Sequence, residues 1–386
     1  MNPLLCHDVL VVGGGPAGAA LACHVAMAGR SVVLLERNRE ARHKVCGEFL
    51  SPETLPFLAE MGIEPASLGA QRIHACRIAA RSILAEVELP EAGWALTRQV
   101  LDEALLVRAK KAGVNVLRGF TVEQLEQSSA WEGNGEWLAR ITNADYVSMW
   151  MRSRDAFLAT GKHDLRGWAR SPEGAQNGLV ALKMYFALSP KEQTNLAGYV
   201  ELITYPGGYA GLQLVEGGLA NLCVLVLRNR LQKLGGSWES LLNYMQDHSL
   251  HLANRLSGAK QALARPLALS SIPYGFQAGL TWKDPALWRL GDQAAVIPSF
   301  CGDGMAIALD TARRAAAMYL DGATHAEFQQ EMKRRFAWRI RLATQLSRAI
   351  VAAPWLVHAV RLWPPVLREI FTATRLPGAA MEGANS

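Results

Sequence analysis

The sequence contains no apolar run of 18 residues and no cysteine pairs at the spacing of a zinc site. Pro354, Pro364 and Pro365, together with several arginines, interrupt the best candidate for a membrane-spanning helix, so none is expected. The six cysteines are scattered along 386 residues. This distribution argues against a disulfide framework and favours reduced thiols in a cytoplasmic protein. No basic leader precedes the first apolar segment, and secretion is not expected.

Low-complexity tracts are absent before the last ten residues, and no internal repeat is evident. The apolar fraction of 50% and the charged fraction of 19% are ordinary for a globular protein, and the length allows two domains. The net charge of +6 is concentrated between residues 331 and 376. A solvated helix face is the common explanation for such a region, although it could also attract an anionic cofactor, an acidic partner or a membrane surface. Nucleic-acid binding is not expected.

The first 36 residues follow a strand, helix, strand pattern. Residues 8–12 (DVLVV) are typical of a strand buried on both faces, residues 17–28 have helical composition, and residues 31–36 predict a second strand. Glu36 ends the second strand, where a carboxylate can accept hydrogen bonds from adenosine ribose hydroxyls and would repel a 2′-phosphate.

Glycines occupy the turn between the first strand and the helix. Gly13 permits a tight bend, Gly15 lets the backbone approach a pyrophosphate, and Gly18 permits close packing of helix and strand. The N–H groups at the helix start would bind the phosphates. The pattern predicts a dinucleotide site, but by itself it does not separate FAD from NAD.

A second segment lies in the C-terminal third. Residues 286–290 predict a strand, Gly291 and Asp292 follow it, and residues 298–305 (PSFCGDGM) lead into an alanine-rich helix. The N-terminus of that helix, near Asp303, would stabilise the negative charge of a reduced flavin through its N–H groups and dipole. An aspartate that caps a helix beside a glycine turn is the alternative interpretation.

Together the two segments resemble the FAD-dependent monooxygenases of the para-hydroxybenzoate hydroxylase type and the related geranylgeranyl reductases and flavin halogenases. The resemblance covers about residues 7–320. It implies an α/β fold, with a Rossmann-like FAD-binding domain, an inserted β-sheet substrate domain and C-terminal helices, and FAD held without a covalent link. It also implies that Asp292 holds a ribityl hydroxyl and that Gly47, in a segment at residues 44–52, lies close to the flavin ring.

By the motifs and by this resemblance, a set of residues is expected to contact the cofactor. They are Gly13, Gly15, Pro16, Ala17, Gly18, Glu36, Arg37, Lys44, Cys46, Gly47, Arg98, Val122, Thr160, Gly161, Gly291, Asp292, Pro298, Gly302, Asp303, Gly304 and Met305.

The sequence departs from the aromatic hydroxylases at one motif. Those enzymes carry an Asp-Gly pair that serves both FAD and NAD(P)H, whereas this chain has Thr160 and Gly161. The electron donor is therefore either NAD(P)H or a separate flavin reductase, which would make an electron-donor protein a partner. A Trp-x-Trp-x-Ile-Pro segment typical of halogenases is absent, so halogenation is a minor option.

The predicted boundaries divide the chain into three parts. They are an FAD-binding domain (1–70, 97–165 and 280–325), a substrate domain (71–96 and 166–279) and a C-terminal helical region (326–386). In the substrate domain, strand patterns are found at 72–80, 83–89, 179–188, 199–205, 209–215 and 219–226, the last three as a meander. Helices are predicted at 97–112, 238–248, 303–320, 325–351 and 355–374.

The predicted meander could form a wall over the flavin. Lys183, Tyr185, Tyr205 and Tyr209 are then candidate substrate residues, although half-buried packing is the commoner role of such tyrosines. The last two helices would complete the core, form a lid over an apolar substrate or make an amphipathic surface patch.

The sequence predicts an FAD-dependent oxidoreductase that acts on an aromatic or lipophilic small molecule, as in secondary metabolism. Hydroxylation by a monooxygenase is the first interpretation, and an ene reductase of the geranylgeranyl reductase kind is the second. A third is a non-catalytic protein that binds FAD or a partner. No catalytic side chain is identified and no metal is expected, because a flavin supplies its own redox chemistry.

Overall fold

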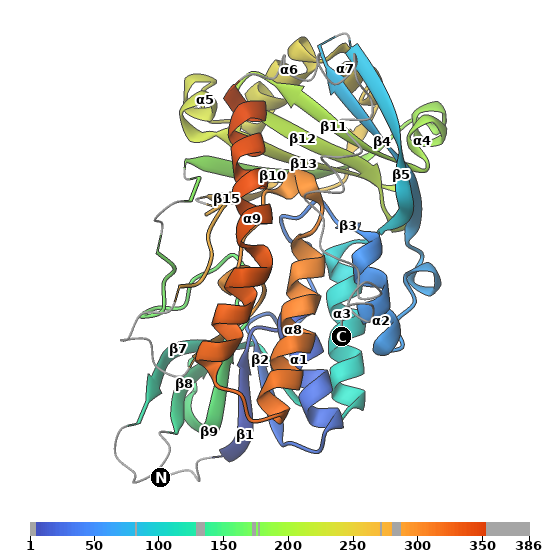
Figure 1. Cartoon of the computed structure of the whole chain (residues 1–386). Coiled ribbons are helices and arrows are strands. Elements are labelled where there is room, and N and C mark those ends of the chain that lie inside the picture. The colour runs from blue at the N-terminus through green and yellow to red at the C-terminus, as the bar shows by residue number, and fades with distance from the viewer. Residues whose placement is uncertain are drawn as a thin grey trace.

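Two β-sheets at opposite ends of the molecule organise the chain, and helices pack beside and between them (Figure 1). The structure is a computed structural model, and it describes residues 5–81, 83–128, 136–171, 175–176, 178–270, 272–279 and 287–352.

The first sheet has seven strands in the described residues, in the order β6-β2-β1-β9-β8-β7 with β16 beside β9. Strands β6, β2, β1, β9 and β16 run parallel, whereas β7 and β8 form an antiparallel extension. The strands are β1 (Leu5–Val12), β2 (Val32–Glu36), β6 (Asn115–Arg118), β7 (Phe120–Gln127), β8 (Trp137–Asn143), β9 (Ser148–Leu158) and β16 (Leu287–Arg289).

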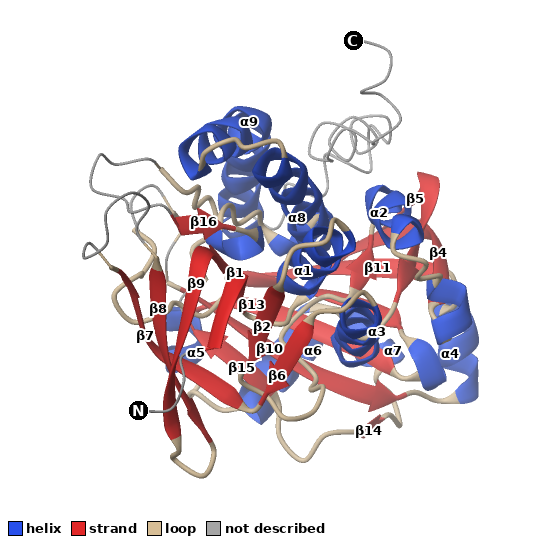
Figure 2. Ribbon diagram, turned by 90° about the horizontal axis from the view of Figure 1, so that it is seen from below, coloured by secondary structure: helices blue, strands red, loops and turns tan. Residues whose placement is uncertain are grey.

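Helices cover one face of this sheet. They are α1 (Pro16–Met27), α2 (Leu55–Glu60), α3 (Arg98–Lys111) and α8 (Gly304–Leu320). Helix α1 is apolar on all sides and almost wholly buried, because α3 and α8 flank it against the parallel strands. The opposite face of β1 and β2 packs on the side chains of the β7–β8 extension, including Val122 and Trp137. In Figure 2, α1, α3 and α8 lie on one side of β1 and β2, and β7 and β8 continue the sheet next to β9.

The second sheet has nine strands in the described residues, in the order β14-β10-β13-β12-β11-β4-β5-β3, with β15 beside β10. The strands are β3 (Phe49–Leu50), β4 (Gln71–Ala80), β5 (Ile83–Ala95), β10 (Leu179–Ala187), β11 (Tyr199–Tyr205), β12 (Gly208–Leu214), β13 (Ala220–Leu227), β14 (Lys260–Gln261) and β15 (Leu267–Ser270). The predicted meander is confirmed as β11–β12–β13, and β4 joins it parallel to β11.

Successive side chains along these strands point to opposite sides, so the second sheet has an outer and an inner face. The outer face packs on a helical layer through residues such as Leu212 and Val224, which meet Trp238 and Leu241. The helices of this region are α4 (Pro190–Leu196), α5 (Arg228–Lys233), α6 (Trp238–His248) and α7 (Leu250–Arg255). The inner face looks toward the first sheet.

The long helix α9 (His325–Ala352) connects the two halves of the molecule. It contacts β16 of the first sheet and β11 and β12 of the second (Figure 1). Phe328, Phe336 and Ile340 are buried in the core that also holds α1 and α8, whereas Trp338 is half exposed. Helix α9 therefore completes the core. The helix predicted at 355–374 lies outside the described residues.

Most predicted elements are present, with shifted ends. The first strand begins at Leu5 and the second strand of the substrate sheet extends to Ala95, beyond the predicted residue 89. Strands β6 to β9 were not predicted, because their mixed polar sequence gives no continuous apolar run.

Candidate functional site

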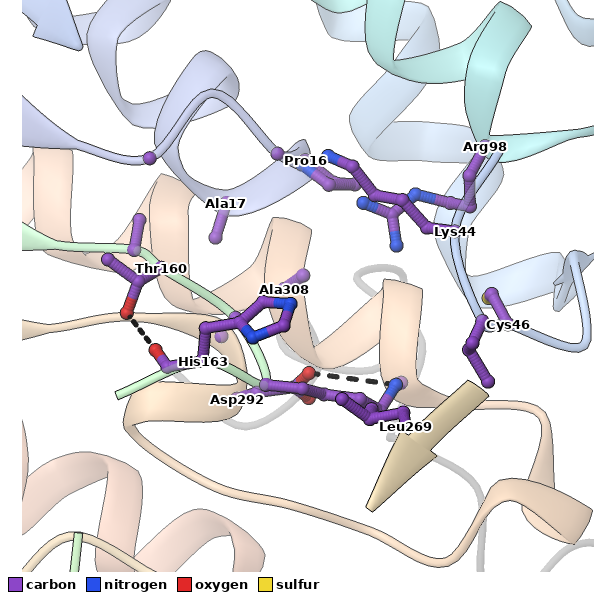
Figure 3. Close-up of a pocket in the computed structure, with 18 of the residues that line it drawn as sticks. Pro16, Ala17, Lys44, Cys46, Arg98, Thr160, His163, Leu269, Asp292 and Ala308 are labelled. Carbon is purple, nitrogen blue, oxygen red and sulfur yellow. Dashed lines mark hydrogen bonds and ion pairs between the residues drawn. The ribbon is translucent and has the colours of Figure 1, made fainter. Parts of the chain in front are cut away.

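A cavity of about 600 Å³ lies between the two sheets. Its walls come from the turn between β1 and α1, the segment 42–49, the start of α3, the loop 159–165, the segments 290–292 and 296–305, and the inner face of the second sheet. In Figure 3, Pro16, Lys44 and Arg98 lie on one side of this space, and Asp292 and Leu269 lie on the other.

The glycine turn is shaped to leave the cavity open. Gly13 has φ +111°, and a Cβ there would lie 2.4 Å from the Ala159 carbonyl oxygen. A Cβ on Gly18 would lie 1.9 Å from the Gly13 oxygen, so this glycine permits the close contact of helix and strand. At Gly15 a Cβ would meet only Arg98 Nη2, at 3.5 Å. Gly15 is the N-cap of α1, and Pro16 follows in the first turn. The turn thus exposes the N-terminus of α1 to the cavity.

Glu36 is fixed at the end of β2. One carboxylate oxygen accepts from the Gly14 N–H at 3.0 Å, and the other accepts from the Asn38 N–H and side-chain amide at 2.9 and 2.6 Å. Because these bonds orient the carboxylate beside the turn, Glu36 could bind the ribose of a dinucleotide without rearrangement.

Two cations lie beside the turn around a buried carboxylate. Asp102 accepts from Arg98 Nε and Nη2 at 2.7 and 2.9 Å and from Lys44 Nζ at 2.7 Å. Although burial acts in the opposite direction, Arg98 and Lys44 lower the pKa of Asp102, and Asp102 in turn raises the pKa of Arg98. The cluster therefore carries a net positive charge next to the N-terminus of α1, which suits a diphosphate.

The loop after β9 and the segment after β16 are tied together at the opposite wall. The Thr160 hydroxyl donates to the His163 carbonyl at 2.6 Å, and Gln293 donates to the Gly161 and His163 carbonyls at 2.8 and 3.1 Å. Asp292 lines the cavity and lies 3.8 Å from Lys162 Nζ. Burial and then the charges of neighbouring cations, Arg37 and Lys44 foremost, lower the pKa of His163.

The start of α8 forms another wall. Gly302 has φ +80° and packs against Phe49, since a Cβ there would lie 2.8 Å from the Phe49 ring. At Gly304 a Cβ would meet no atom within 4 Å, so this backbone is open to a ligand. Asp303 is fully buried and occupies the N-cap position of α8, but its side chain makes no capping hydrogen bond.

The structure brings the predicted cofactor residues together, with three differences. Gly18, Pro298 and Asp303 do not line the cavity, whereas the other predicted residues do. Gly18 acts through helix packing, and Pro298 and Asp303 lie behind the lining on either side of Gly302.

None of the four candidate substrate residues lines the cavity. Lys183 and Tyr185 lie one layer behind it and contact Glu48. The Tyr209 hydroxyl forms a hydrogen bond of 2.9 Å with Ser299 Oγ, and Ser299 lines the cavity. A pocket role for Tyr205 is wrong, because this side chain points to the outer face of the sheet and its hydroxyl donates to the Leu225 carbonyl. Sequence alternation did not reveal which face of each strand is inward.

An apolar part of the cavity was not predicted. Its lining residues are mostly aliphatic, and they include Ala181, Cys223, Leu225, Leu267, Leu269, Ile272, Tyr274, Val296 and Ile297. Burial raises the pKa of the Cys223 thiol to about 12, so the thiol is neutral and adds no charge. Strand β15 and residues 272–274 supply much of this wall, and only their apolar composition could have marked them in the sequence.

Comparison with known proteins agrees with this geometry. Residues 7–132 match the model of a family described as FAD binding domain. Menaquinone reductase of Mycolicibacterium smegmatis is 26% identical over 334 residues, which cover 82% of this chain and 76% of the relative. Digeranylgeranylglycerophospholipid reductase 1 of Methanothermobacter thermautotrophicus is 29% identical over 261 residues, which cover 62% of this chain and 60% of the relative.

Solved structures share the whole architecture. A flavoprotein/dehydrogenase from Cytophaga hutchinsonii superposes with a TM-score of 0.78 at 18% identity, over 96% of this chain and 92% of the other. Other structures with this fold include flavin-dependent halogenases and a geranylgeranyl bacteriochlorophyll reductase-like protein. This chain therefore carries an FAD-binding domain within residues 7–132 and has the fold of these flavoproteins. It is an FAD-dependent oxidoreductase.

The cavity fits the cofactor of this flavoprotein. The open backbone at Gly15 and the cations Arg98 and Lys44 would hold the diphosphate, and Glu36 would hold the adenosine ribose. Asp292 would hold the ribityl chain. In the described part of the chain, no group of three or more His, Cys, Asp or Glu side chains could hold a metal ion, and no helix there is long and apolar enough to cross a membrane.

Proposed function

We propose that this flavoprotein reduces a carbon–carbon double bond in a lipophilic substrate that carries an isoprenoid chain. The observation that carries the proposal is the apolar compartment, in which the inner face of the second sheet, including β15, meets residues 272–274. Burial of hydrocarbon contributes about 0.8 kcal/mol per CH₂ group. A compartment lined by Leu225, Leu269 and Ile272 therefore favours an alkyl or prenyl chain over a polar metabolite.

The relatives support the same substrate class. Their names specify reduction of menaquinone and of a digeranylgeranylglycerophospholipid, which both carry isoprenoid chains. Hydroxylation of an aromatic or lipophilic molecule, the first interpretation from the sequence, is the second candidate. The same water-poor compartment beside the N-terminus of α8 would serve it, so the two reactions are separated by their products.

Bound FAD would supply a hydride when reduced. The residues of the chain bind and orient the reactants and control water and protons. Arg98 and Lys44 would anchor the cofactor at its diphosphate, and the N–H groups that begin α8 would favour negative charge on it. The apolar compartment would hold the substrate tail and exclude water, so that the double bond stays close to the segment around Cys46 and Gly47.

The electron donor can be replaced in the test by dithionite, so that neither NAD(P)H nor a flavin reductase has to be chosen. The FAD-loaded protein is reduced without oxygen and mixed with a menaquinone in detergent, and products are measured by mass spectrometry. After air has reoxidised the quinol ring to the quinone, we expect a product that is still heavier by two hydrogens, which are then located in the prenyl chain. Free reduced FAD at the same concentration is the control.

Two outcomes would overturn the proposal. A product that gains one oxygen atom from ¹⁸O₂ in aerobic turnover, with no anaerobic reduction, would assign the protein to the monooxygenases. A protein that binds FAD and changes neither menaquinones nor prenyl lipids would support the non-catalytic alternative.

A further inference from the structure

A chain of buried polar groups connects the interior of the second sheet to the cavity. Glu48 and Lys183 are both fully buried, and Lys183 Nζ lies 2.6 Å from Glu48 Oε1. The Tyr185 hydroxyl lies 2.9 and 2.8 Å from the two Glu48 oxygens and 3.1 Å from Nδ1 of His43. His43 lines the cavity. The groups thus form a continuous path from Glu48 to a cavity-facing imidazole.

The loop that carries Glu48 is also held by hydrogen bonds that do not belong to this path. The carbonyls of Cys46 and Gly47 already accept hydrogen bonds from the side-chain amides of Gln213 and Asn221 on the neighbouring strands. Glu48 also has φ +63°, a left-handed conformation that is unfavourable for a residue with a side chain. A buried ion pair is weak evidence for stability, because desolvation offsets much of its attraction. The cluster therefore has features typical of a functional site.

The donors and acceptors of Glu48, Tyr185 and His43 allow two arrangements of the protons along the path. When Glu48 is ionised it can only accept, so the Tyr185 hydroxyl donates to Glu48 and accepts from Nδ1–H of His43. In that arrangement Nε2 carries no proton. When Glu48 is protonated it donates to Tyr185, Tyr185 donates to Nδ1, and Nε2–H is the ring donor left for a molecule in the cavity.

We propose that Glu48, Tyr185 and His43 are a proton relay that delivers one proton to a substrate in the cavity. The inference rests on the proposed function, because reduction of a double bond adds a hydride to one carbon and a proton to the other. His43 would be the catalytic acid, because the carboxylate of Glu48, which also lines the cavity, is fully buried and is bonded to Lys183 and Tyr185. Tyr185 and Glu48 act through it.

The transfer balances within the protein. His43 breaks its Nε2–H bond and gives that proton to the substrate carbon, while Nδ1 takes the proton of Tyr185 and the Tyr185 oxygen takes the proton of Glu48. The net change is the loss of one proton by Glu48, which becomes a carboxylate beside the Lys183 ammonium. After product release, Nε2 takes up a proton from solvent and Nδ1 returns its proton through Tyr185 to Glu48, which restores the arrangement with protonated Glu48. The imidazole is neutral at the start and at the end.

The charged groups around His43 agree with this role. They are Glu48 in its own segment, Lys183 on β10 and Glu216 in the 3₁₀ turn at Glu216–Gly218. Burial and then Lys183 lower the pKa of His43, and Glu216 opposes this, so the ring is neutral near pH 7. Burial raises the pKa of the Glu48 carboxyl, and Lys183 acts against this effect.

The first test compares Tyr185→Phe with Tyr205→Phe. Both tyrosines are buried in the same sheet and donate a hydroxyl bond, but Tyr205 lies on the outer face. We expect Tyr185→Phe to retain FAD and to lower the rate at which the menaquinone side chain is reduced anaerobically about 100-fold or more, in the range of general acid catalysis. Tyr205→Phe should keep the wild-type rate. A Tyr185→Phe rate within threefold of wild type would overturn the relay.

The second test replaces the acid itself. His43→Ala should lose the rate to a similar extent, and added imidazole should restore part of it, because a small acid can occupy the space of the ring. Rescue that depends on imidazole concentration supports the role of His43. A folded, FAD-loaded His43→Ala protein with full activity excludes it.

The third test does not depend on turnover. ¹⁵N NMR of the oxidised protein without substrate should show that the His43 ring proton moves between Nδ1 and Nε2 as Glu48 ionises, and that Tyr185→Phe abolishes this movement. A proton distribution that is the same in wild type and Tyr185→Phe would refute the relay. If wild-type protein reduces no prenyl substrate, the proposed function fails, and the NMR result still decides whether the three groups are coupled.

Discussion

Replacement of Arg98 by Met is the sharpest test of the phosphate side of the cavity. The change keeps the length of the side chain and removes the guanidinium that lies beside Gly15. Asp102 retains Lys44 at 2.7 Å and is not left alone. A charge-assisted hydrogen bond to a phosphate contributes about 1.5–3 kcal/mol. Since 1.4 kcal/mol corresponds to a factor of ten, the Kd for FAD should rise roughly 10- to 150-fold.

A matched control exists on α8. Arg314 pairs with the buried Asp310 at 3.0 Å, and Asp310 keeps Arg335 at 2.9 Å when Arg314 is removed. The Arg314→Met protein therefore loses an i,i+4 ion pair of the same kind, but outside the cavity. FAD titrations of the apoproteins, followed by quenching of flavin fluorescence, should show a weakened Kd for Arg98→Met alone. Equal affinities in the two variants would refute the assignment of the diphosphate to this side.

The same cluster predicts how stability depends on pH. The pKa of Asp102 is lower in the folded protein than its ordinary value of about 3.9, despite burial, because of Arg98 and Lys44. Its contribution to the free energy of unfolding is therefore fully present above about pH 4 and is lost as the pH falls through the folded pKa. In Arg98→Met the folded pKa should rise, so the loss should begin at a higher pH. Urea unfolding between pH 3 and 7 measures the difference.

Three further substitutions address other walls. Gly15→Val should abolish FAD binding, because its side chain would project into the cavity at the start of α1, and a variant that purifies yellow would disprove that placement. Asp292→Ala should weaken FAD retention by about 1.5–3 kcal/mol through loss of a charge-assisted bond to a buried hydroxyl, as measured by equilibrium dialysis. Equal dialysis constants would remove Asp292 from the site. Leu269→Gln should raise the KM for a prenylated quinone about tenfold and leave FAD affinity unchanged, since burial of one leucine contributes about 1.5–3 kcal/mol. An unaltered KM would contradict the location of the substrate tail.

The sequence by itself determined the dinucleotide-binding half of this protein. Gly13, Gly15 and Gly18 are separated by few residues, and Gly13 and Gly18 occupy positions where a Cβ would collide with neighbouring backbone. A Cβ at Gly18 would collide with the Gly13 carbonyl whatever the rest of the chain does. Glu36 follows at a spacing fixed by one helix and one strand. Motifs of this kind can be interpreted without a structure because their geometry is set by neighbours in the chain.

The tertiary structure alone decided what faces the cavity. Tyr185 and Tyr205 both occur in strand patterns, yet one contacts the cavity segment and the other the helical layer, because the pleat of each strand is set by its partners. Glu48 and Lys183 are 135 residues apart in the sequence and meet only after the second sheet folds over the segment 43–49. The apolar wall at β15 likewise forms by pairing with β10. These contacts depend on long-range strand register, which periodicity in a single segment does not encode.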